Sequence, residues 1–387
     1  MRNRKYDSRT MRKPVNKPEK TASAASSFAP AASAQTLPGF THSRAQFEEL
    51  ADAAMSHARK LGASDVAADV SESAGLSVSA RQGELETVEH SLDKSLAVTV
   101  YIGHKSGSAS TCDFSPQAVR QTVQAAYDIA RYITEDPASG LPDEADVAGP
   151  QAASLDLDLF HPWNPSVEQA LALALACEQA ALQTSPHISN SEGAGVSAQQ
   201  SHFFSAHSHG FRGGYASSRH SFSVSVIAGQ GDAMQRDGWF SAERNAARLA
   251  SPEAVGRYAA ERALSRVGAR KISTRECPVL FEAPLAAGLL GHFVQAVSGG
   301  ALYRKNTFLA GSLGQPVFAG HVEITENPFI PGGRGSAPFD GEGVRVTPRQ
   351  VVQAGRVAGY FLGSYSARKL GMKTTGNAGG SHNLRLY

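Results

Sequence analysis

Apolar residues recur at helical spacing in five stretches of the chain, and boundary residues typical of helices flank them. Ser43, before the first stretch, is a common N-cap residue, and Gly62, after it, is a common C-terminal stop. Prolines near the start of three other stretches suit a first helical turn, where no amide hydrogen is needed. The pattern predicts helices over residues 43–61, 115–130, 166–183, 252–267 and 284–298.

Alternating and β-branched runs predict strands between these helices. The clearest strands are residues 76–80 and 96–102, and a turn at residues 82–84 could lead to a further strand over residues 84–90. Residues 193–228 alternate repeatedly and predict a meander. Shorter strand signals lie at residues 278–281, 344–346, 351–352, 360–362 and 383–387. Because helix and strand signals are segregated rather than alternating, we predict an α+β fold with antiparallel sheets and segregated helices.

Composition divides the chain into an extension and two domains. Residues 1–40 are basic and then rich in alanine and serine, which predicts a disordered extension. Residues 41–270 hold most helix signals and predict an N-terminal α+β domain. Residues 271–387 predict a β-rich C-terminal domain. A chain of 387 residues is long enough to bury two cores.

Charge and cysteine usage restrict the partners and the compartment. The first 20 residues carry a net charge of +6, so the whole-chain value of +2 leaves about −4 for the rest, which argues against a nucleic-acid partner for the folded part. No apolar run reaches the ~18 residues of a membrane span, so we expect no membrane partner. Cys112, Cys177 and Cys277 are an odd, widely spaced set without a secretory signal, which predicts a reduced, cytoplasmic chain. An organellar transit peptide is the lesser alternative.

The helix predicted at residues 284–298 resembles a metallopeptidase helix that lacks most of its chemistry. A zinc helix needs two histidines in reach of one metal and a glutamate that takes a proton from metal-bound water. This stretch offers one imidazole, His292, and we expect Gly299 and Gly300 to end the helix. The sequence therefore leaves three interpretations of His292: a remnant of a lost zinc motif, a metal ligand, or a residue with no role in the chemistry.

Three other regions are weaker candidates for a site. The densest histidine group has no carboxylate among its members, which favours packing over metal binding, although His207 and His209 would share a strand face. Residues 340–345 alternate acids and glycines, but Val344 and Arg345 break a calcium-loop pattern, so we expect a turn. Residues 376–380 fit no phosphate loop and predict tight turns. The histidines of that group are His202, His207, His209 and His220.

A cluster of hydroxyls and cations lies at residues 364–369. A serine beside a lysine can act as a nucleophile if the pKa of the lysine is depressed, which leaves Ser364 or Ser366 open as catalytic residues. Binding of a carboxylate or of a peptide backbone by Arg368 is the more favoured interpretation, and a structural role is favoured above both.

Seven segments taken together resemble the TldD/PmbA metallopeptidase family. The resemblance runs in order from about residue 45 to the last residue, so it depends on no single motif. Its segments are residues 107–110, 113–118, 127–132, 155–160, 303–305, 338–344 and 364–371.

This resemblance implies a two-domain protein that pairs with a related subunit into a cytosolic zinc peptidase for unfolded or short peptides. In the family, the TldD-type subunit carries an H-E-x-x-x-H motif and a Cys near its C-terminus, and the PmbA (TldE) type, which this chain resembles, lacks these ligands. An ungapped register places Gly291, His292 and Ala296 at the three motif positions. The resemblance thus implies no metal in this chain and zinc in a TldD-like partner. It also implies that the chain stops before the family's last segment, leaving the C-terminal domain truncated.

The resemblance also suggests contact residues and two competing functions. Tyr303, Arg304, Arg368 and Lys369 are the candidate contacts for a peptide or a partner. The leading hypothesis is a non-catalytic subunit that completes a TldD-like peptidase, with peptide bound as an added strand. The alternative is a non-proteolytic regulatory protein of the gyrase-modulator type, an activity associated with the family. An independent serine hydrolase is the third and weakest hypothesis.

Overall fold

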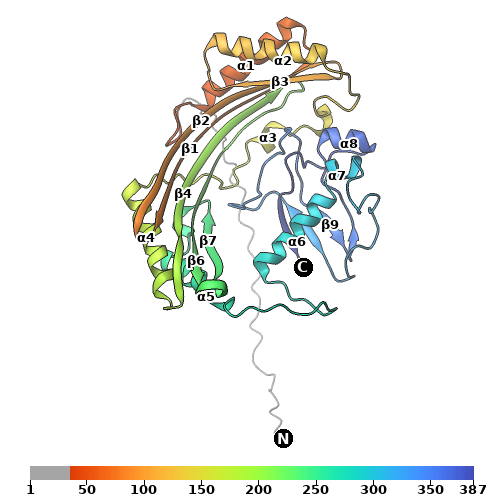
Figure 1. Cartoon of the computed structure of the whole chain (residues 1–387). Helices are drawn as coiled ribbons and strands as arrows, with labels where there is room; N and C mark the ends of the chain where they lie inside the picture. Colours follow the sequence, from red (N-terminus) through yellow and green to blue (C-terminus); the bar gives the residue numbers. More distant parts are fainter. Residues whose placement is uncertain (1–34) are drawn as a thin grey trace, which may run out of the picture. The chain divides into compact units, whose positions relative to one another are not determined.

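Two antiparallel sheets organise residues 35–387, the part of the chain that the computed structural model describes (Figure 1). The α+β class with antiparallel sheets is confirmed. The extension predicted at residues 1–40 lies almost wholly outside the described residues. The first sheet has the order β3-β2-β1-β4-β6-β7, with β5 paired to β4, and the second has the order β10-β9-β8-β11. The two sheets fall on either side of residue 270, the predicted domain boundary.

The first sheet contains the long strands of the molecule. Its members are β1 (Asp65–Arg81), β2 (Glu84–Ile102), β3 (Lys105–Thr111), β4 (Ile188–His207), β5 (Arg212–Gly213), β6 (Ala216–Ala228) and β7 (Gln235–Glu243). The second sheet consists of β8 (Ile324–Asn327), β9 (Arg349–Gln353), β10 (Arg356–Val357) and β11 (Asn383–Leu386). The helices are α1 (Arg44–Leu61), α2 (Pro116–Tyr132), α3 (Pro150–Ala153), α4 (Val167–Gln183), α5 (Pro252–Ser265), α6 (Ala283–Ala296), α7 (Gly299–Tyr303) and α8 (Ser364–Leu370).

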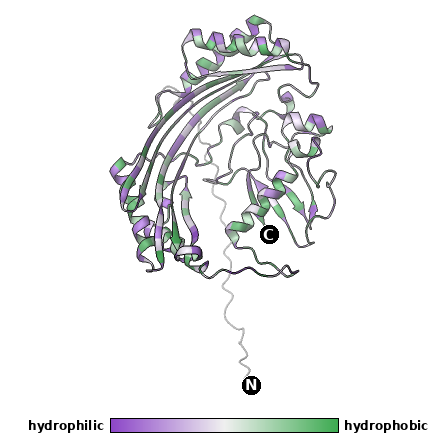
Figure 2. Ribbon diagram, in the orientation of Figure 1, coloured by the Kyte–Doolittle hydropathy of each residue, from purple (hydrophilic) through white to green (hydrophobic). Residues whose placement is uncertain are grey.

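Strict alternation gives the first sheet one apolar and one polar face, visible as alternating colours along its strands in Figure 2. On β1 the even-numbered residues from Val66 to Ala80 are buried, except for the half-buried Ala74. Side chains on a strand point alternately to opposite faces, so the odd-numbered residues share the other face. Pairing between strands aligns that face across the sheet, and it is rich in serine. Its serines on β1, β4 and β6 are Ser71, Ser73, Ser77, Ser79, Ser197, Ser201, Ser205, Ser217, Ser221, Ser223 and Ser225.

Helices cover the apolar face at its two ends. At one end α1 and α2 pack on β1, β2 and β4 around fully buried residues such as Phe47 and Phe204. At the other end α4 and α5 bury Val78 and Val226. In Figure 1 the C-terminal elements, drawn in blue, lie on the opposite side of this curved sheet from α4. The polar face is therefore the face that the second half of the chain meets.

A buried carboxylate lies between the two helix pairs. Glu72 is 2% exposed and accepts the backbone N–H groups of Thr41 and His42, at 2.8 and 2.9 Å. Burial alone would raise its pKa, but these N–H donors and His202 outweigh that cost and lower the pKa to about 2. Burial also lowers the pKa of His202, so a neutral His202 donates from Nε2 to Glu72.

Three predictions of short strands are wrong. Residues 278–281 form no strand, because no other segment of the described chain pairs with them, and Leu280 is 98% exposed. Residues 344–346 and 360–362 make only isolated bridges. These join Val344 to Val147, Arg345 to Phe339 and Phe361 to Ser298. An apolar run becomes a strand only where a neighbour supplies its hydrogen bonds.

The helices of the second half also differ from expectation. Gly299 and Gly300 do not end α6, which stops at Ala296; they begin α7, with Ser298 at its N-cap. Helix α8 was not predicted, because seven residues are too few to show a helical period. Across residues 35–387, no helix combines the length and apolar character needed to cross a membrane.

Strand β3 lies so close to helix α2 that Gly107 leaves no room for a side chain. A Cβ atom on Gly107 would lie 2.2 Å from the carbonyl oxygen of Ala126 and 2.5 Å from the nitrogen of Ala130. Backbone atoms cannot move away cheaply, so we expect Gly107→Ala to lower the free energy of unfolding by about 1–3 kcal/mol in urea titrations. Gly288→Ala on α6 is the control, because no atom lies within 4 Å of the added Cβ. Equal effects of the two substitutions would contradict this packing.

Candidate functional site

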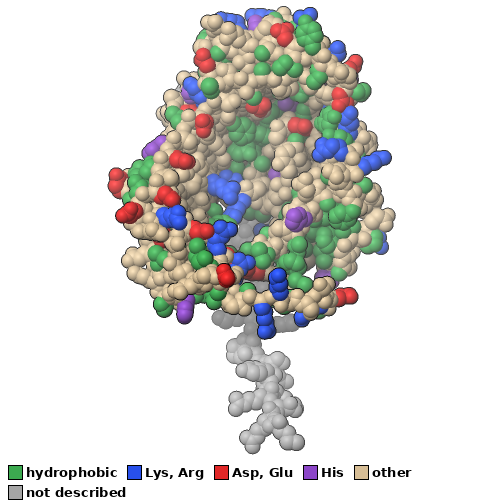
Figure 3. Space-filling view, viewed as in Figure 1, with side chains coloured by type: hydrophobic (Ala, Val, Ile, Leu, Met, Phe, Trp, Pro, Cys, Tyr) green, Lys and Arg blue, Asp and Glu red, His purple; other side chains and the backbone are tan. Residues whose placement is uncertain are grey.

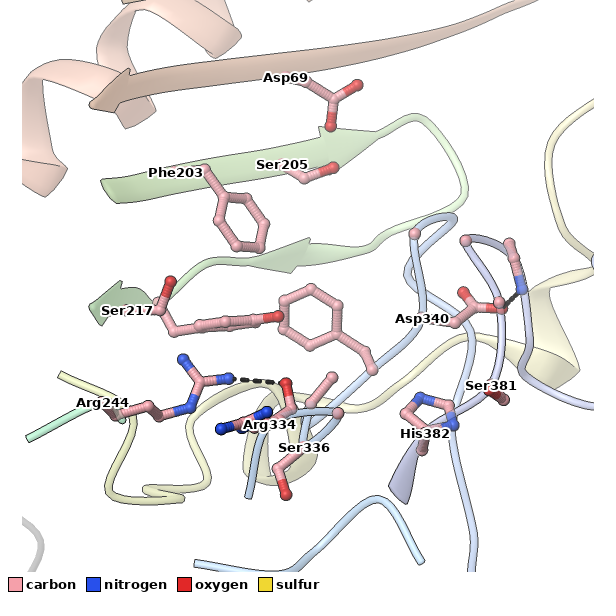
Figure 4. A pocket seen from close by; sticks show the side chains of 18 residues that line it. Asp69, Phe203, Ser205, Ser217, Arg244, Arg334, Ser336, Asp340, Ser381 and His382 are labelled. Atoms are coloured by element: carbon pink, nitrogen blue, oxygen red, sulfur yellow. Dashed lines mark hydrogen bonds between the residues drawn. The ribbon is translucent and has the colours of Figure 1, made fainter. Parts of the chain in front are cut away.

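A pocket of about 340 Å³ opens on the polar face of the first sheet, where loops of the second half approach it. This volume is at the lower end of the ~300–1,000 Å³ typical of small-ligand sites. Figure 3 shows this side of the molecule hollowed, with Lys and Arg side chains along the hollow. The sheet contributes Asp69 and Ser205 to the lining, and the second half contributes residues 334–337, 339–341 and 378–382 (Figure 4).

Asp340 fixes two loops of the pocket to each other. Its Oδ1 accepts the N–H groups of Glu342 and Val344, and its Oδ2 accepts the N–H group of Ala378, each at 2.9 Å. Burial raises the pKa of Asp340 to about 6, although these donors act in the opposite direction. The turn predicted at residues 340–345 is confirmed, and so are the tight turns of residues 376–380, where Gly376 has a φ of +69°.

His382 is held against the pocket by a buried glutamate. Glu326 is 1% exposed, and its carboxylate lies 2.6 Å from Nε of Arg349 and 3.0 Å from Nδ1 of His382. Burial alone would raise the pKa of Glu326, but hydrogen bonds from His382 and the charge of Arg349 lower it to about 2. Because an ionised carboxylate only accepts, Nδ1 of His382 carries the hydrogen and Nε2 is free to accept when the ring is neutral.

Two arginines form a cationic end of the pocket. Arg244, just after β7, donates to the carbonyl oxygens of Gly333, Ser218 and Arg334, and Arg334 donates to that of Ala242. Figure 4 shows both side chains at the same end of the pocket, away from Asp69. Burial lowers the pKa of Arg244, because it removes water from a charge that only neutral carbonyls contact.

Asp69 occupies the opposite end. Solvent in the pocket reaches its carboxylate, yet the sheet and the facing loops surround it, and this surrounding protein raises its pKa despite a hydrogen bond with Ser205. An aromatic wall of Phe203, Tyr215 and Phe339 lies beside these groups, with ring centroids 4.8–6.1 Å apart. The pocket thus offers cations at one end, a carboxylate at the other and an apolar wall.

Similarity to known proteins covers most of the chain. Three family models match in order: domain 1 of the PmbA/TldA metallopeptidases at residues 66–130, their central domain at residues 160–267 and their C-terminal domain at residues 274–386. Metalloprotease PmbA of Escherichia coli O157:H7 is 46% identical over 317 residues, which are 82% of this chain and 70% of that protein.

The chain belongs to the PmbA/TldD metallopeptidase family. A PmbA homologue of Haemophilus influenzae is 43% identical over 88% of this chain and 75% of its own length. Among solved structures, a putative modulator of DNA gyrase from Bacteroides thetaiotaomicron has a TM-score of 0.81 at 24% identity, and TldE from Thermococcus kodakarensis has 0.67 at 17%. Each match covers 88% of this chain and 77% of the other, and at these identities they show the shared fold.

Helix α6 contains the positions where this metallopeptidase family was expected to hold zinc. Gly291 and His292 are exposed and Ala296 is half-buried, so the three positions supply one imidazole and no second ligand. Within residues 35–387 no group of three or more His, Cys, Asp or Glu side chains is placed to hold a metal ion. This part of α6 does not fit a zinc site, which needs three or four converging ligands.

The predicted contact residues lie away from the pocket. Arg368 donates to the carbonyl oxygens of Ala138, Gly140 and Leu141 and to Asp143, and Nζ of Lys369 lies 2.7 Å from Asp136. Both cations of α8 therefore join the second half to the loop at residues 136–143. On α7 the ring of Tyr303 packs on Tyr365, 5.8 Å between centroids, and the exposed Arg304 lies over Tyr303. A role of these four residues in binding stays a prediction.

The serines at residues 364–369 lack an activated lysine. The hydrogen bond with Asp136 raises the pKa of Lys369, which is the opposite of what a lysine base requires. The Ser366 hydroxyl donates to the carbonyl oxygen of Gly363, and the buried Ser364 hydroxyl has no partner among the described residues. This geometry favours the structural interpretation of the cluster.

The histidine group does not converge. His202 bonds to Glu72, and His220 bonds to the carbonyl oxygen of His161 at 2.8 Å. The expectation that His207 and His209 share a strand face is wrong, because β4 ends at His207 and His209 lies in the following turn. Burial lowers the pKa of His207 to about 4, so this ring is neutral and packs on Phe211.

The glutamate behind His382 makes a pH-dependent contribution to stability. Since its pKa falls from 4.5 to about 2 on folding, the ionised form stabilises the fold above pH 4.5, and this stabilisation is lost as the pH falls towards 2. We expect Glu326→Gln to cost about 3 kcal/mol at pH 7 and clearly less at pH 3, measured by urea unfolding. Glu276→Gln, at an exposed residue, should cost under ~0.5 kcal/mol at both pH values. A cost that does not change with pH would contradict an ionised Glu326.

Proposed function

We propose that this chain is a PmbA-like subunit that pairs with a TldD-like zinc peptidase to process or degrade unfolded or short peptides. The chain itself contributes no zinc ligand, the partner holds the metal, and the pair works in the cytoplasm. The observation that supports this proposal is helix α6, to which the ungapped register assigns the family's zinc motif but which offers only His292. Family membership supplies the peptidase context, because the relatives at 46% and 43% identity are named metalloprotease PmbA and a homologue of it.

The polar face supports a role in holding peptide. An unfolded peptide presents backbone amides and carbonyls at regular spacing, and serine hydroxyls can both donate to and accept from them. Strands β7 and β11 end their sheets, so each has one side on which an extended peptide could add as a further strand. A face that binds backbone rather than particular side chains suits substrates of varied sequence.

Co-expression with a TldD-like subunit tests the division of labour. We expect the pair to co-purify, to contain zinc by elemental analysis and to cleave an unstructured fluorogenic peptide. This chain alone should contain no zinc and should not cleave the peptide. His292→Ala should leave the zinc content and the cleavage rate of the pair within about twofold, because one exposed imidazole makes no metal site. Zinc and cleavage by this chain alone, lost in His292→Ala, would overturn the proposal.

An apolar surface on and before α6 is the candidate contact with the partner. Leu280 is 98% exposed, Leu285 59% and Leu289 47%. Exposed apolar side chains gathered in this way typically mark interaction sites in soluble proteins. A TldD-like subunit is the occupant that we propose, since the family pairs two related chains and this surface adjoins the helix where the two kinds of chain differ.

Replacement of Leu289 tests this surface. We expect Leu289→Asp to weaken pairing roughly tenfold or more, because it places a charge in an apolar contact, as measured by titration of one subunit into the other. Met234→Asp, at a similarly exposed apolar residue of the first half, is the control and should pair normally. Normal pairing by both variants would show that the partner does not bind at the surface around Leu289.

A second candidate is a regulatory protein without peptidase activity. Two solved structures of similar fold, from Bacteroides thetaiotaomicron and Thermotoga maritima, are described as putative modulators of DNA gyrase, which favours this candidate. Purification that recovers gyrase with this chain and no TldD-like subunit would support this candidate over the first.

A further inference from the structure

Arg244, one of the two arginines of the pocket, lacks the counter-charge that the other half-buried arginines of residues 35–387 possess. Arg262 pairs with Asp237 and Glu282, and Arg349 pairs with Glu326. Arg244 is also half-buried, yet among residues 35–387 its hydrogen bonds go only to carbonyl oxygens. A guanidinium that has lost part of its hydration and has no anionic partner in the protein is stabilised when an anionic ligand binds to it.

The geometry of the pocket restricts which anion fits. Arg244 and Arg334 converge at one end, so together they can hold a planar, bidentate group such as a carboxylate. Phe203, Tyr215 and Phe339 form an apolar wall beside that end, suited to an apolar side chain. Asp69 and Asp340 also line the pocket, and they would repel a doubly charged phosphate more than a singly charged carboxylate.

We propose that this pocket binds the free C-terminal carboxylate of a peptide, held by Arg244 and Arg334. The aromatic wall takes the side chain of the last residue, and the rest of the peptide extends over the serine-rich face. His382, whose Nδ1 is held by Glu326, offers Nε2 as an acceptor for a peptide N–H group. This proposal rests on the proposed function in peptide processing, and it assigns this subunit the recognition of peptide ends.

Peptides with blocked and free ends test the assignment on the full chain. The probe is an N-acetylated, fluorophore-labelled unstructured pentapeptide ending in leucine, and binding is followed by fluorescence anisotropy. We expect the free acid to bind roughly 10- to 100-fold more tightly than the C-terminal amide, as the loss of hydrogen bonds to a charged group implies. Equal binding of the two forms would overturn the proposal.

Two further probes distinguish a C-terminal carboxylate from other anions that the two arginines could bind. The amidated peptide with an internal aspartate carries a carboxylate on a side chain, and we expect it to bind as weakly as the plain amide. If it binds like the free acid, the site recognises acidic side chains and the assignment to a C-terminus fails. Inorganic phosphate should not compete at concentrations where free acetyl-leucine does, and competition by phosphate alone would overturn the carboxylate assignment.

Arginine variants locate the binding. Arg244→Lys keeps the charge but loses the planar fork, and Arg334→Gln removes a charge from an exposed side chain that makes one carbonyl contact. Each should reduce the preference for the free acid at least about fivefold. Arg120→Gln with Arg257→Gln removes two exposed charges elsewhere and should keep the preference.

The arginine variants also allow for loss of folding. If Arg244→Lys unfolds, Arg334→Gln decides, and an unchanged preference in it would exclude the pocket. All of these measurements use this chain alone, so a negative result would not contradict the proposed pairing or the zinc content of the complex. Conversely, a failure to pair would leave the preference for free acids measurable.

Discussion

The register of the first sheet is the constraint on which the rest of the structure depends. Side chains alternate along β1, β4 and β6, so a slip of one residue in any pairing would exchange the apolar and serine-rich faces. Val70, Val78 and Val226 would then face water, and the helices would meet serines. Burial under α1, α2, α4 and α5 thus fixes the apolar face, and the same pairing leaves a polar face for the second half of the chain to meet.

Buried carboxylates attach loops to this framework through backbone amides. Glu72 accepts two amides of the segment before α1, Glu178 accepts two amides of the β1–β2 turn, and Asp340 accepts three amides from two loops. Each acid loses water on burial, and N–H groups compensate part of that cost by bonds to charge. Glu326 differs, because an arginine and a histidine supply most of its partners. Of these acids, Asp340 and Glu326 hold segments that line the pocket.

Local patterns predicted the parts of the fold that local physics determines. Capping residues and apolar periods located five helices, and alternation located parts of β1, β2, β4 and β6 but neither β3 nor β7. The strand at residues 278–281 failed because strand formation depends on a partner segment that the pattern cannot reveal. The pocket was missed for a related reason. Asp69, Arg244, Arg334 and His382 are isolated polar residues in sequence, and only the meeting of the sheet with distant loops brings them together. Asp340 was recognised as a turn residue, but its bond to Ala378, 38 positions away, was not predictable.

The division of chemistry between the two halves has a consequence for function. The sheet provides a broad, weakly discriminating surface of hydroxyls, because serine can bond to any peptide backbone. The first half supplies one cation to the pocket, Arg244, which lies just after β7. Its guanidinium donates to the carbonyl oxygens of Gly333 and Arg334 in the facing loop. The loop carries the second cation, and Asp340 and Glu326 hold the neighbouring turns and His382 in place. Neither half alone would present a directed charge over an extended polar face. The proposed recognition of a peptide would therefore depend on the contact between the halves, and substitutions that loosen that contact should affect binding before they affect either core.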